Sequence, residues 1–258
     1  MKDCREEWYD KEAKVAVTIV DVTSAAQELA RGHLAGPTST HFLTEALASV
    51  ALLGAEMSEK DETVILQMKC RGPLGGYNVE CTSEGTLRGY AEKKVLEDFD
   101  GLGKPDAGKV VGEAQIQVTR SVPGRILSQG ISTSVDGYLA GSLQRKASIR
   151  TEVAVSDEVE VLEARGLMVE ILPDSVRGEP EISSCSSLSS SSRKILDSLG
   201  FQHAELRKTT PLKFACRCSP DRAIAMLAAL SEEERKALPP TIDITCHMCG
   251  KTFTVRTK

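Results

Sequence analysis

The chain has 258 residues, a formal net charge of −5 and 41% hydrophobic residues, but only 4% aromatic residues. This length allows one large domain or a domain with a small module, and the core must consist mainly of aliphatic side chains. The acidic balance argues against a general nucleic-acid binder, because attraction to phosphate supplies most of that affinity. Residues 1–14 are charged and no apolar run is long enough to cross a bilayer. We therefore expect a soluble, cytoplasmic protein that binds neither nucleic acid nor membrane, and an organellar location stays open.

Two helices are predicted after the N-terminal stretch. The segment 23–33 begins with a capping hydroxyl that is followed by good helix formers. A second helix is expected with Thr38 or Ser39 as its capping residue, because apolar residues recur over positions 42–53 at intervals of three and four. We interpret this apolar stripe as core packing rather than as an interface.

The period of the apolar residues then changes to two, which predicts strands. Residues 63–70, 77–81 and 86–91 are expected to form an antiparallel meander with glycine-containing turns. Further strands are predicted at 113–120, 125–134, 153–161 and 167–172. This order of elements predicts an α+β core domain, an antiparallel sheet with packed helices, over residues 1–173.

The composition changes after residue 173. Residues 183–192 contain eight serines, interrupted only by Cys185 and Leu188, and such a stretch buries too little apolar surface to fix its own structure. We predict that residues 174–212 form a flexible, metastable linker. A short helix within it is expected between Ser192 and Gly200, with an apolar side that must rest on another part of the protein. That apolar side consists of Ile195, Leu196 and Leu199.

Four of the eight cysteines lie near the C-terminal end, in a C-x-C motif and a C-x-x-C motif separated by 27 residues. They are Cys216, Cys218, Cys246 and Cys249. Two close thiol pairs can bind one tetrahedral Zn²⁺ ion, and Gly250 fits the positive-φ position after the last cysteine. Residues 213–258 hold too few apolar groups to fold alone, so we predict a small zinc-binding module whose stability a metal completes.

Within this module the sequence predicts a helix that begins at Pro220, a second short helix after Ser231, and strands at 241–245 and 252–256. Zinc with four thiolates carries a net negative charge, which nearby basic residues could balance. These residues are Lys213, Arg217 and Lys251.

The spacing of the four cysteines alone favours a zinc site that only holds the fold together. A thioredoxin-like redox pair is disfavoured because no βαβ pattern lies beside the C-x-x-C motif. Residues 103–110 resemble a phosphate-binding loop, but they lack the Ser or Thr that contacts magnesium and do not lie between a strand and a helix. We find no credible catalytic acid–base pair, so the chain is not expected to be an enzyme.

The remaining four cysteines do not form a candidate site. Cys70 and Cys81 lie on adjacent predicted strands and are interpreted as small core residues rather than as a disulfide. Cys4 and Cys185 lie in polar stretches, which predicts that both are exposed.

Taken together, these residues resemble the heat shock protein 33 family of redox-regulated holdase chaperones. The C-x-C and C-x-x-C motifs match the zinc signature of that family, and the resemblance extends over most of the chain. Outside the zinc module the clearest match is formed by residues 66–76 and 85–90. Residues 26–54 resemble the N-terminal region of the family, and residues 167–173 resemble the end of its core domain.

The resemblance implies a core domain, a metastable linker and a zinc switch. In the reduced state the protein would hold one Zn²⁺ ion with the four cysteines and would be inactive. Oxidation would form two disulfides, Cys216–Cys218 and Cys246–Cys249, and zinc would leave. The switch and the linker would then unfold and expose a surface that binds unfolded client proteins without ATP. A homodimer on activation is also implied.

The chain departs from the family pattern at two places. The serine run replaces the charged helix formers that are usual in the linker, and Leu143 stands where the family has an acidic residue. A rival interpretation is a structural zinc-ribbon adaptor that binds partners without redox switching, and a thiol oxidoreductase is a weaker one. The sequence leaves open the clients, the surface that binds them, the oxidant threshold and the oligomeric state.

Overall fold

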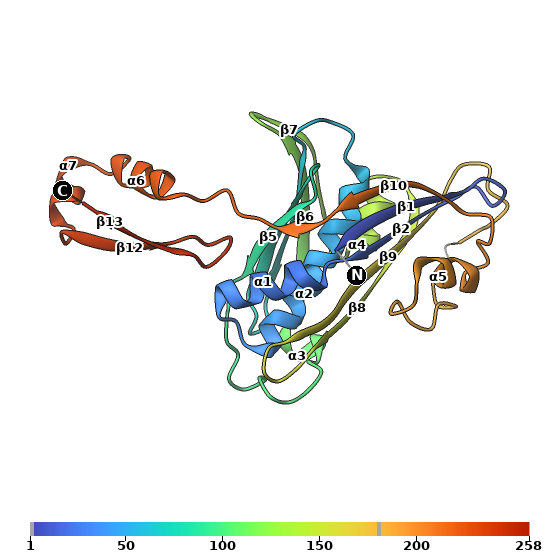
Figure 1. Ribbon diagram of the computed structural model, residues 1–258, viewed down its shortest axis with the longest axis horizontal. Coiled ribbons are helices and arrows are strands. Elements are labelled where there is room, and N and C mark those ends of the chain that lie inside the picture. The colour runs from blue at the N-terminus through green and yellow to red at the C-terminus, as the bar shows by residue number, and fades with distance from the viewer. Residues whose placement is uncertain (1–2, 180–181, 258) are drawn as a thin grey trace.

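The computed structural model describes residues 3–179 and 182–257 (Figure 1). Two large sheets and a two-stranded hairpin form its framework. Every strand pair described is antiparallel except the short parallel pair of β11 and β5. The predicted α+β class with antiparallel sheets is therefore confirmed. None of the described helices combines the length and the apolar character needed to cross a membrane.

The first sheet has the strand order β10-β1-β2-β9-β8. Its strands are β10 (Glu205–Pro211), β1 (Cys4–Asp10), β2 (Val15–Asp21), β9 (Val161–Ile171) and β8 (Lys146–Val155). The second sheet has the order β11-β5-β4-β3-β6-β7. Its strands are β11 (Lys213–Phe214), β5 (Thr86–Ala91), β4 (Gly76–Thr82), β3 (Thr63–Cys70), β6 (Ala114–Val122) and β7 (Arg125–Ser132). The helices of this part are α1 (Thr23–His33), α2 (Pro37–Leu53), α3 (Ala107–Val110) and α4 (Val135–Gly141), with the 3-10 turn η1 (Gly54–Glu56).

Helix α2 is the centre of the main core because it packs against strands of both large sheets. All of its residues except Pro37 and Glu45 are buried. The predicted apolar stripe is core packing, as expected, but the helix is covered on more than one side. A helix enclosed in this way is buried almost all round, which explains why its apolar residues spread beyond one stripe.

The predicted helix 23–33 and the predicted strands 63–70 and 86–91 have the bounds of α1, β3 and β5. The predicted strand 153–161 is wrong, because β8 ends at Val155 and β9 begins at Val161. Between them the chain turns through Val159, whose φ is 64°, so the alternating valines run through a turn rather than along one strand. β1, β2, α4 and β10 have no counterpart among the predicted elements.

Residues 182–204, which we name the covering segment, pack on the outer face of the first sheet. The segment contains the short helix α5 (Ser192–Ser198), close to the predicted position. Its buried residues are Ile182, Cys185, Leu188, Ile195, Leu196, Leu199, Phe201 and Ala204. Beneath them on the sheet lie Val15, Val17, Ile19, Leu167, Val169 and Ile171. The predicted apolar side of α5 therefore rests on the core sheet.

The prediction that Cys185 is exposed is wrong: its side chain is only 2% exposed because Ile182 and Leu188 bring the chain down onto the sheet. The serine run is placed against the sheet by polar contacts. The amide of Leu188 donates to Glu152 Oε2 over 2.6 Å, and Arg165 Nη1 donates to the Leu188 carbonyl over 2.7 Å. Ser189 Oγ donates to Glu163 Oε1 over 2.6 Å.

The chain that follows the covering segment joins both sheets. β10 pairs with the outer side of β1, and β11 then pairs with β5 of the second sheet. Most side chains of β10 are exposed, so its place depends mainly on backbone pairing with β1. The division of the chain at residues 173 and 212 stays a prediction.

Glu62, the residue before β3, is a buried carboxylate that ties three segments together. Its side chain is 0% exposed, and its Oε1 accepts from Arg120 Nε over 2.6 Å. The amides of Ser58 and Glu59 donate to its Oε2 over 2.9 and 3.0 Å. Burial alone would raise the pKa of Glu62, but these hydrogen bonds outweigh burial and hold the pKa below its usual value.

This lowered pKa predicts the direction of acid destabilisation. The folded state holds the Glu62 proton more weakly than the unfolded chain, so the stabilisation is complete above the ordinary carboxyl pKa of about 4.3. It is lost as pH falls through the lower pKa of the folded state. We expect Glu62→Gln to reduce the free energy of unfolding at pH 7 by about 1–3 kcal/mol and to flatten this acid dependence. Urea unfolding followed by circular dichroism from pH 7 to pH 3 measures both effects. The exposed Glu84→Gln is the control, and equal acid dependence in the two variants would contradict the assignment.

Candidate metal site at four cysteines

The C-terminal module consists of α6 (Pro220–Ala228), α7 (Glu232–Ala237), β12 (Thr241–Thr245) and β13 (Thr252–Arg256). These bounds agree with the predicted elements. The side chain of Ser219 caps α6, and Ser231 with Glu234 forms a capping box at α7. The buried apolar cluster of the module contains only Ala223, Leu227, Phe253 and Val255. Such a small cluster supplies little stability, so the module needs a further source of it.

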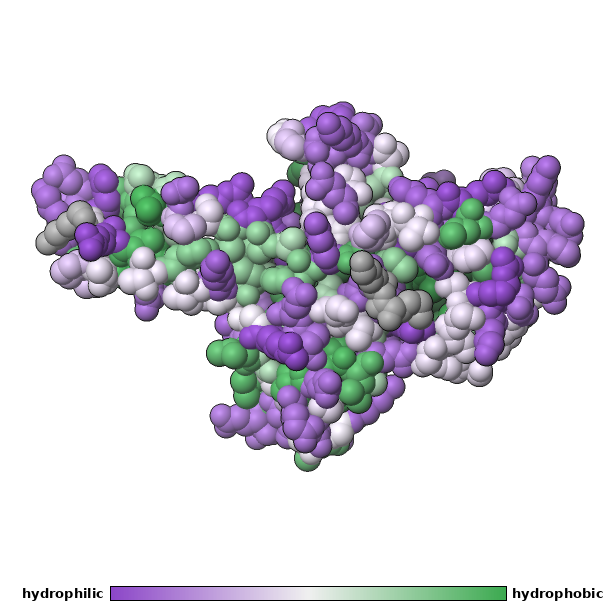
Figure 2. Space-filling model, viewed as in Figure 1, coloured by the Kyte–Doolittle hydropathy of each residue, from purple (hydrophilic) through white to green (hydrophobic). Residues whose placement is uncertain are grey.

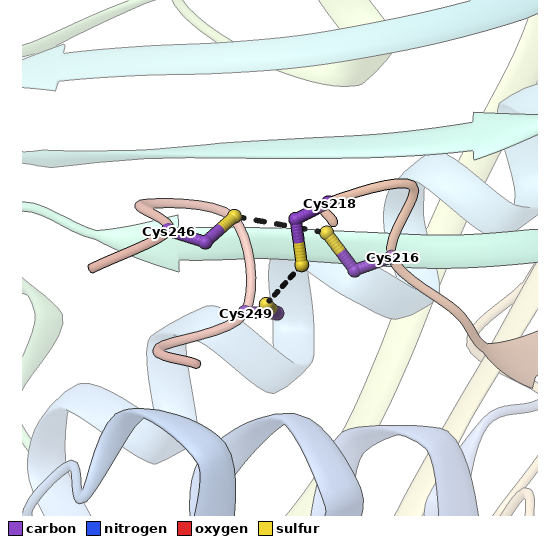
Figure 3. Close-up of side chains that lie close together, drawn as sticks. All are labelled: Cys216, Cys218, Cys246 and Cys249. Atoms are coloured by element: carbon purple, nitrogen blue, oxygen red, sulfur yellow. Dashed lines mark hydrogen bonds between the residues drawn. The ribbon is translucent and has the colours of Figure 1, made fainter. Parts of the chain in front are cut away.

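The four predicted cysteines come together at one point of this module (Figure 3). Their sulfur atoms all lie within 4.8 Å of one another. Across the two motifs, 3.7 Å separates the Sγ atoms of Cys216 and Cys246 and 3.5 Å separates those of Cys218 and Cys249. All four thiols are free, since a disulfide would require about 2.05 Å between sulfurs.

Backbone geometry shapes the C-x-x-C turn. The amide of Gly250 donates to the Cys246 carbonyl over 2.9 Å, and the amide of Cys246 donates to the Lys251 carbonyl over 2.9 Å. Gly250 has a φ of 73°, so the expected positive-φ position is confirmed. The turn therefore presents both of its sulfurs on one side.

The sulfur cluster fits a tetrahedral metal ion. A Zn–S distance of about 2.3 Å places the sulfurs of a tetrahedron about 3.8 Å apart. The two sulfur distances between the motifs, 3.7 and 3.5 Å, are close to this edge length. The donor set also suits zinc, since thiolate sulfur is a preferred ligand of that ion. The four cysteines can thus hold one metal ion without rearrangement of the fold.

The electrostatics of the cluster favour a bound cation. Burial opposes ionisation of Cys216, but hydrogen bonds from the Cys218 amide and from Arg88 lower the pKa of its thiol to about 7. Burial, together with the neighbouring sulfurs, raises the pKa of Cys218 and of Cys249. Four thiolates at this spacing repel one another, so a divalent cation is the natural means of keeping them all ionised.

The core domain supplies a basic residue that the sequence does not reveal as part of the site. Arg88 Nη1, on β5, donates to Cys216 Sγ over 3.6 Å, although 128 positions separate the two residues. The only sequence signal is that Arg88 lies in the stretch 85–90 that resembles the family. Of the basic residues expected to balance the cluster, Arg217 pairs instead with Glu80 over 2.8 Å, and Lys251 lies over the Phe253 ring at 5.3 Å.

The other cysteines and the loop at 103–110 form no site with this cluster. Cys81 is buried and faces Val64 across the β3–β4 ladder, so the prediction that it does not pair with Cys70 is confirmed. Cys4, predicted to be exposed, is half-buried. The segment 103–110 ends in the single turn α3, and the carbonyls of Val110 and Val111 accept hydrogen bonds from the amides of Leu74 and Gly72.

Comparison with known proteins finds similarity over nearly the whole chain. The family model described as "Hsp33 protein" matches residues 7–256. A "33 kDa chaperonin" of Symbiobacterium thermophilum is 30% identical, with 90% of this chain and 86% of the relative covered. A "33 kDa chaperonin" of Thermus thermophilus is 28% identical, with coverage of 92% and 79%. The solved structure of the 33 kDa chaperonin (heat shock protein 33 homolog) of Thermotoga maritima has a TM-score of 0.87 at 22% identity, covering 100% of this chain and 96% of that one, and so supports the fold.

The geometry predicts that the reduced protein binds one divalent metal ion per chain. We expect Cys246→Ser to lower the affinity at least about 100-fold, since losing a direct ligand should cost no less than losing an outer-shell partner. Titration with Co²⁺, followed through its thiolate charge-transfer absorption, measures the affinity and the number of sulfur ligands. Cys70→Ser is the matched control, because Cys70 lies on β3 and outside the cluster. Unchanged absorption in Cys246→Ser would contradict the ligand set.

Proposed function

The chain belongs to the Hsp33 family, and from that premise we propose that it is an ATP-independent holdase chaperone that oxidation of its four clustered cysteines switches on. The family is one of chaperones rather than enzymes, and the curated relatives carry the name 33 kDa chaperonin. The observation that carries the proposal is the sulfur cluster, because four free thiols within 4.8 Å combine a metal site with a store of oxidisable sulfur.

In the proposed reduced state Cys216, Cys218, Cys246 and Cys249 hold one Zn²⁺ ion. When bound, zinc would keep the sulfurs as thiolates and supply the stability that the small apolar cluster of the module lacks. We propose that this state is inactive, because the covering segment then hides the apolar face of the first sheet. Figure 2 shows mostly hydrophilic or neutral surface over the part of the molecule that contains α5.

Oxidation removes the sulfur ligands in pairs. Two thiols and one molecule of hydrogen peroxide give one disulfide and two molecules of water, so two equivalents of peroxide convert all four cysteines. By the family resemblance we propose the pairs Cys216–Cys218 and Cys246–Cys249. All four thiols are free in the structure, so each pair must close to about 2.05 Å between its sulfurs, and both turns must change shape. A disulfide sulfur is no thiolate ligand, so a module with both disulfides would no longer hold the metal and would lack that source of stability.

The route from the module to the covering segment runs through β11 and β10. The covering segment rests on the first sheet and not on the module, so loss of the module cannot uncover its apolar side directly. We propose that the unfolded module releases β11 first and then β10, an edge strand whose side chains are mostly exposed. The covering segment loses its C-terminal attachment and gains chain entropy when it leaves the sheet.

The proposed client-binding surface is the sheet face under the covering segment. Each of its apolar side chains is at most 7% exposed while the segment is in place. They are Val15, Val17, Ile19, Leu167, Val169 and Ile171. A continuous apolar face of this kind suits the exposed apolar groups of unfolded proteins. By the same resemblance we propose a cytoplasmic location and a homodimer on activation.

Peroxide at mild heat should convert the reduced, zinc-loaded protein to the active state. We expect the loss of four thiols, the release of one equivalent of zinc and suppressed aggregation of a heat-denatured client enzyme, followed by light scattering. Cys246→Ser should hold little zinc and show no oxidant-dependent gain, whereas Cys70→Ser should respond like wild type. Retained zinc with no gain in suppression would instead favour a structural zinc-ribbon adaptor, and turnover of a disulfide substrate would favour an oxidoreductase.

Loosening the covering segment should activate the protein partly without oxidant. Leu196 on α5 is 0% exposed, and its replacement by serine should cost about 1.5–3 kcal/mol of docking free energy. We expect stronger binding of a hydrophobic dye and higher basal suppression, with zinc content unchanged. Trp8, whose ring lies 5.0 Å from the Arg193 guanidinium of α5, reports undocking through its fluorescence. Lys194→Ser, at an exposed position of the same helix, is the control. Equal dye binding in both variants would refute the covering role.

A further inference from the structure

The C-x-x-C turn lies directly against the core domain. The amide of Gly89, on β5, donates to the Met248 carbonyl over 3.2 Å. Two glycines face each other across the contact: a Cβ on Gly32 would lie 2.5 Å from the Cys249 carbonyl oxygen, and a Cβ on Gly250 would lie 1.9 Å from the Gly32 carbonyl oxygen. Backbone therefore packs on backbone at the end of α1, and neither side leaves space for a side chain.

Two rings of the core surface, those of His33 and Tyr90, line the same contact. His33 is buried, and its Nε2 lies 2.8 Å from the Gly89 carbonyl oxygen, which fixes the end of α1 to β5. The Tyr90 ring meets the His247 ring edge-on, with 5.5 Å between centroids. The turn thus meets a surface that α1 and β5 build together.

The C-x-C motif is tied to the same part of the core by charge. Glu80, on β4, is only 6% exposed, and its carboxylate binds both Arg88 of the core and Arg217 of the motif. Arg88 in turn donates to Cys216 Sγ. Just before the motif, the amide of Ala215 donates to the Leu87 carbonyl over 3.1 Å, which continues the pairing of β11 with β5. Both cysteine motifs are therefore attached to β5 and its neighbours.

We propose that this core surface, which we name the docking edge, positions the two cysteine motifs and sets how readily their thiolates are oxidised. The docking edge consists of Gly32, His33, Glu80, Arg88 and Gly89. The proposal deepens the proposed redox switch and rests on it.

Two features of the docked state slow oxidation. Cys249 is 5% exposed, so peroxide has little access to its sulfur. Disulfides within each motif also require a change of shape, because all four thiols are free in the docked state and a disulfide needs about 2.05 Å between its sulfurs. A turn held on its main chain by Gly89 and Gly32 resists that change of shape. Undocking of the turn is therefore the step that precedes disulfide formation, and the strength of docking fixes the oxidant threshold.

Gly32→Ala tests the docking edge without touching a cysteine. Alanine is the better helix former, so α1 keeps its stability, while the new Cβ displaces the Cys249 carbonyl. We expect thiol loss and metal release at fixed peroxide to become about tenfold faster, and exchange of the Gly89 amide hydrogen in the reduced protein to rise by a similar factor. Gly141→Ala in α4 is the control, since a Cβ there meets no atom within 4 Å.

Arg217→Gln tests the charged part of the docking edge independently. The Arg217 side chain is 53% exposed, so its replacement leaves the fold intact while it removes the bond to Glu80. We expect thiol loss and metal release at fixed peroxide to become faster here too, but by less than in Gly32→Ala, because the glycine contact remains. Arg222→Gln is the control, because it removes the same charge from the same module. The Arg222 guanidinium makes no ion pair among the described residues.

The outcomes separate this inference from the proposed function. Wild-type protein that loses thiols and metal under peroxide, with Gly32→Ala and Arg217→Gln indistinguishable from their controls, would overturn the docking edge and leave the switch standing. Wild-type protein that ignores peroxide would overturn the switch. Hydrogen exchange of the Gly89 amide in the reduced variants would still decide whether the turn is docked, since an unprotected amide in wild type contradicts the contact.

Discussion

The C-terminal module depends on one electrostatic constraint: four sulfurs must stay within 4.8 Å of one another although their ionised forms repel. The apolar cluster beside them contains four buried residues and cannot hold them together by itself. A shared cation satisfies the constraint, and disulfides abolish it, because they remove the charges and the ligands together. Under the proposed switch, the same four atoms would stabilise the module in one chemical state and dismantle it in another.

In the proposed switch, the order of elements along the chain would carry the loss of the module to the distant covering segment. The module follows β11, β11 follows β10, and β10 follows the covering segment. Two means attach these pieces to the core: backbone pairing for β10 and β11, and apolar packing for the covering segment. The main core is centred on α2 between the two sheets, and of these pieces only the chain at β11, through Leu212 and Phe214, packs against it. Under the proposed switch, most of this core would stay folded while the pieces that cover it detach.

Sequence patterns predict those features of the structure that residues close together in the chain determine. The alternation at 63–70 and 86–91, the caps of α6 and α7 and the spacing of the cysteines are all visible in the sequence, and the structure agrees with them. Long-range contacts are not visible. Cys185 sits in a polar stretch, and only the sheet beneath it shows why it is buried. Arg88 reaches Cys216 across 128 positions, and β1 is rich in charged residues that obscure its strand period.

The facing glycines at the docking edge have a consequence for how this protein can change in evolution. At most close contacts both residues can change during evolution, because a larger side chain on one partner is offset by a smaller one on the other. Gly32 and Gly250 are both already the smallest residue, and each is blocked by a main-chain oxygen rather than by a side chain. No compensating substitution exists for either position, so a lineage can alter this contact only by giving it up, and with it whatever sensitivity to oxidant the contact sets.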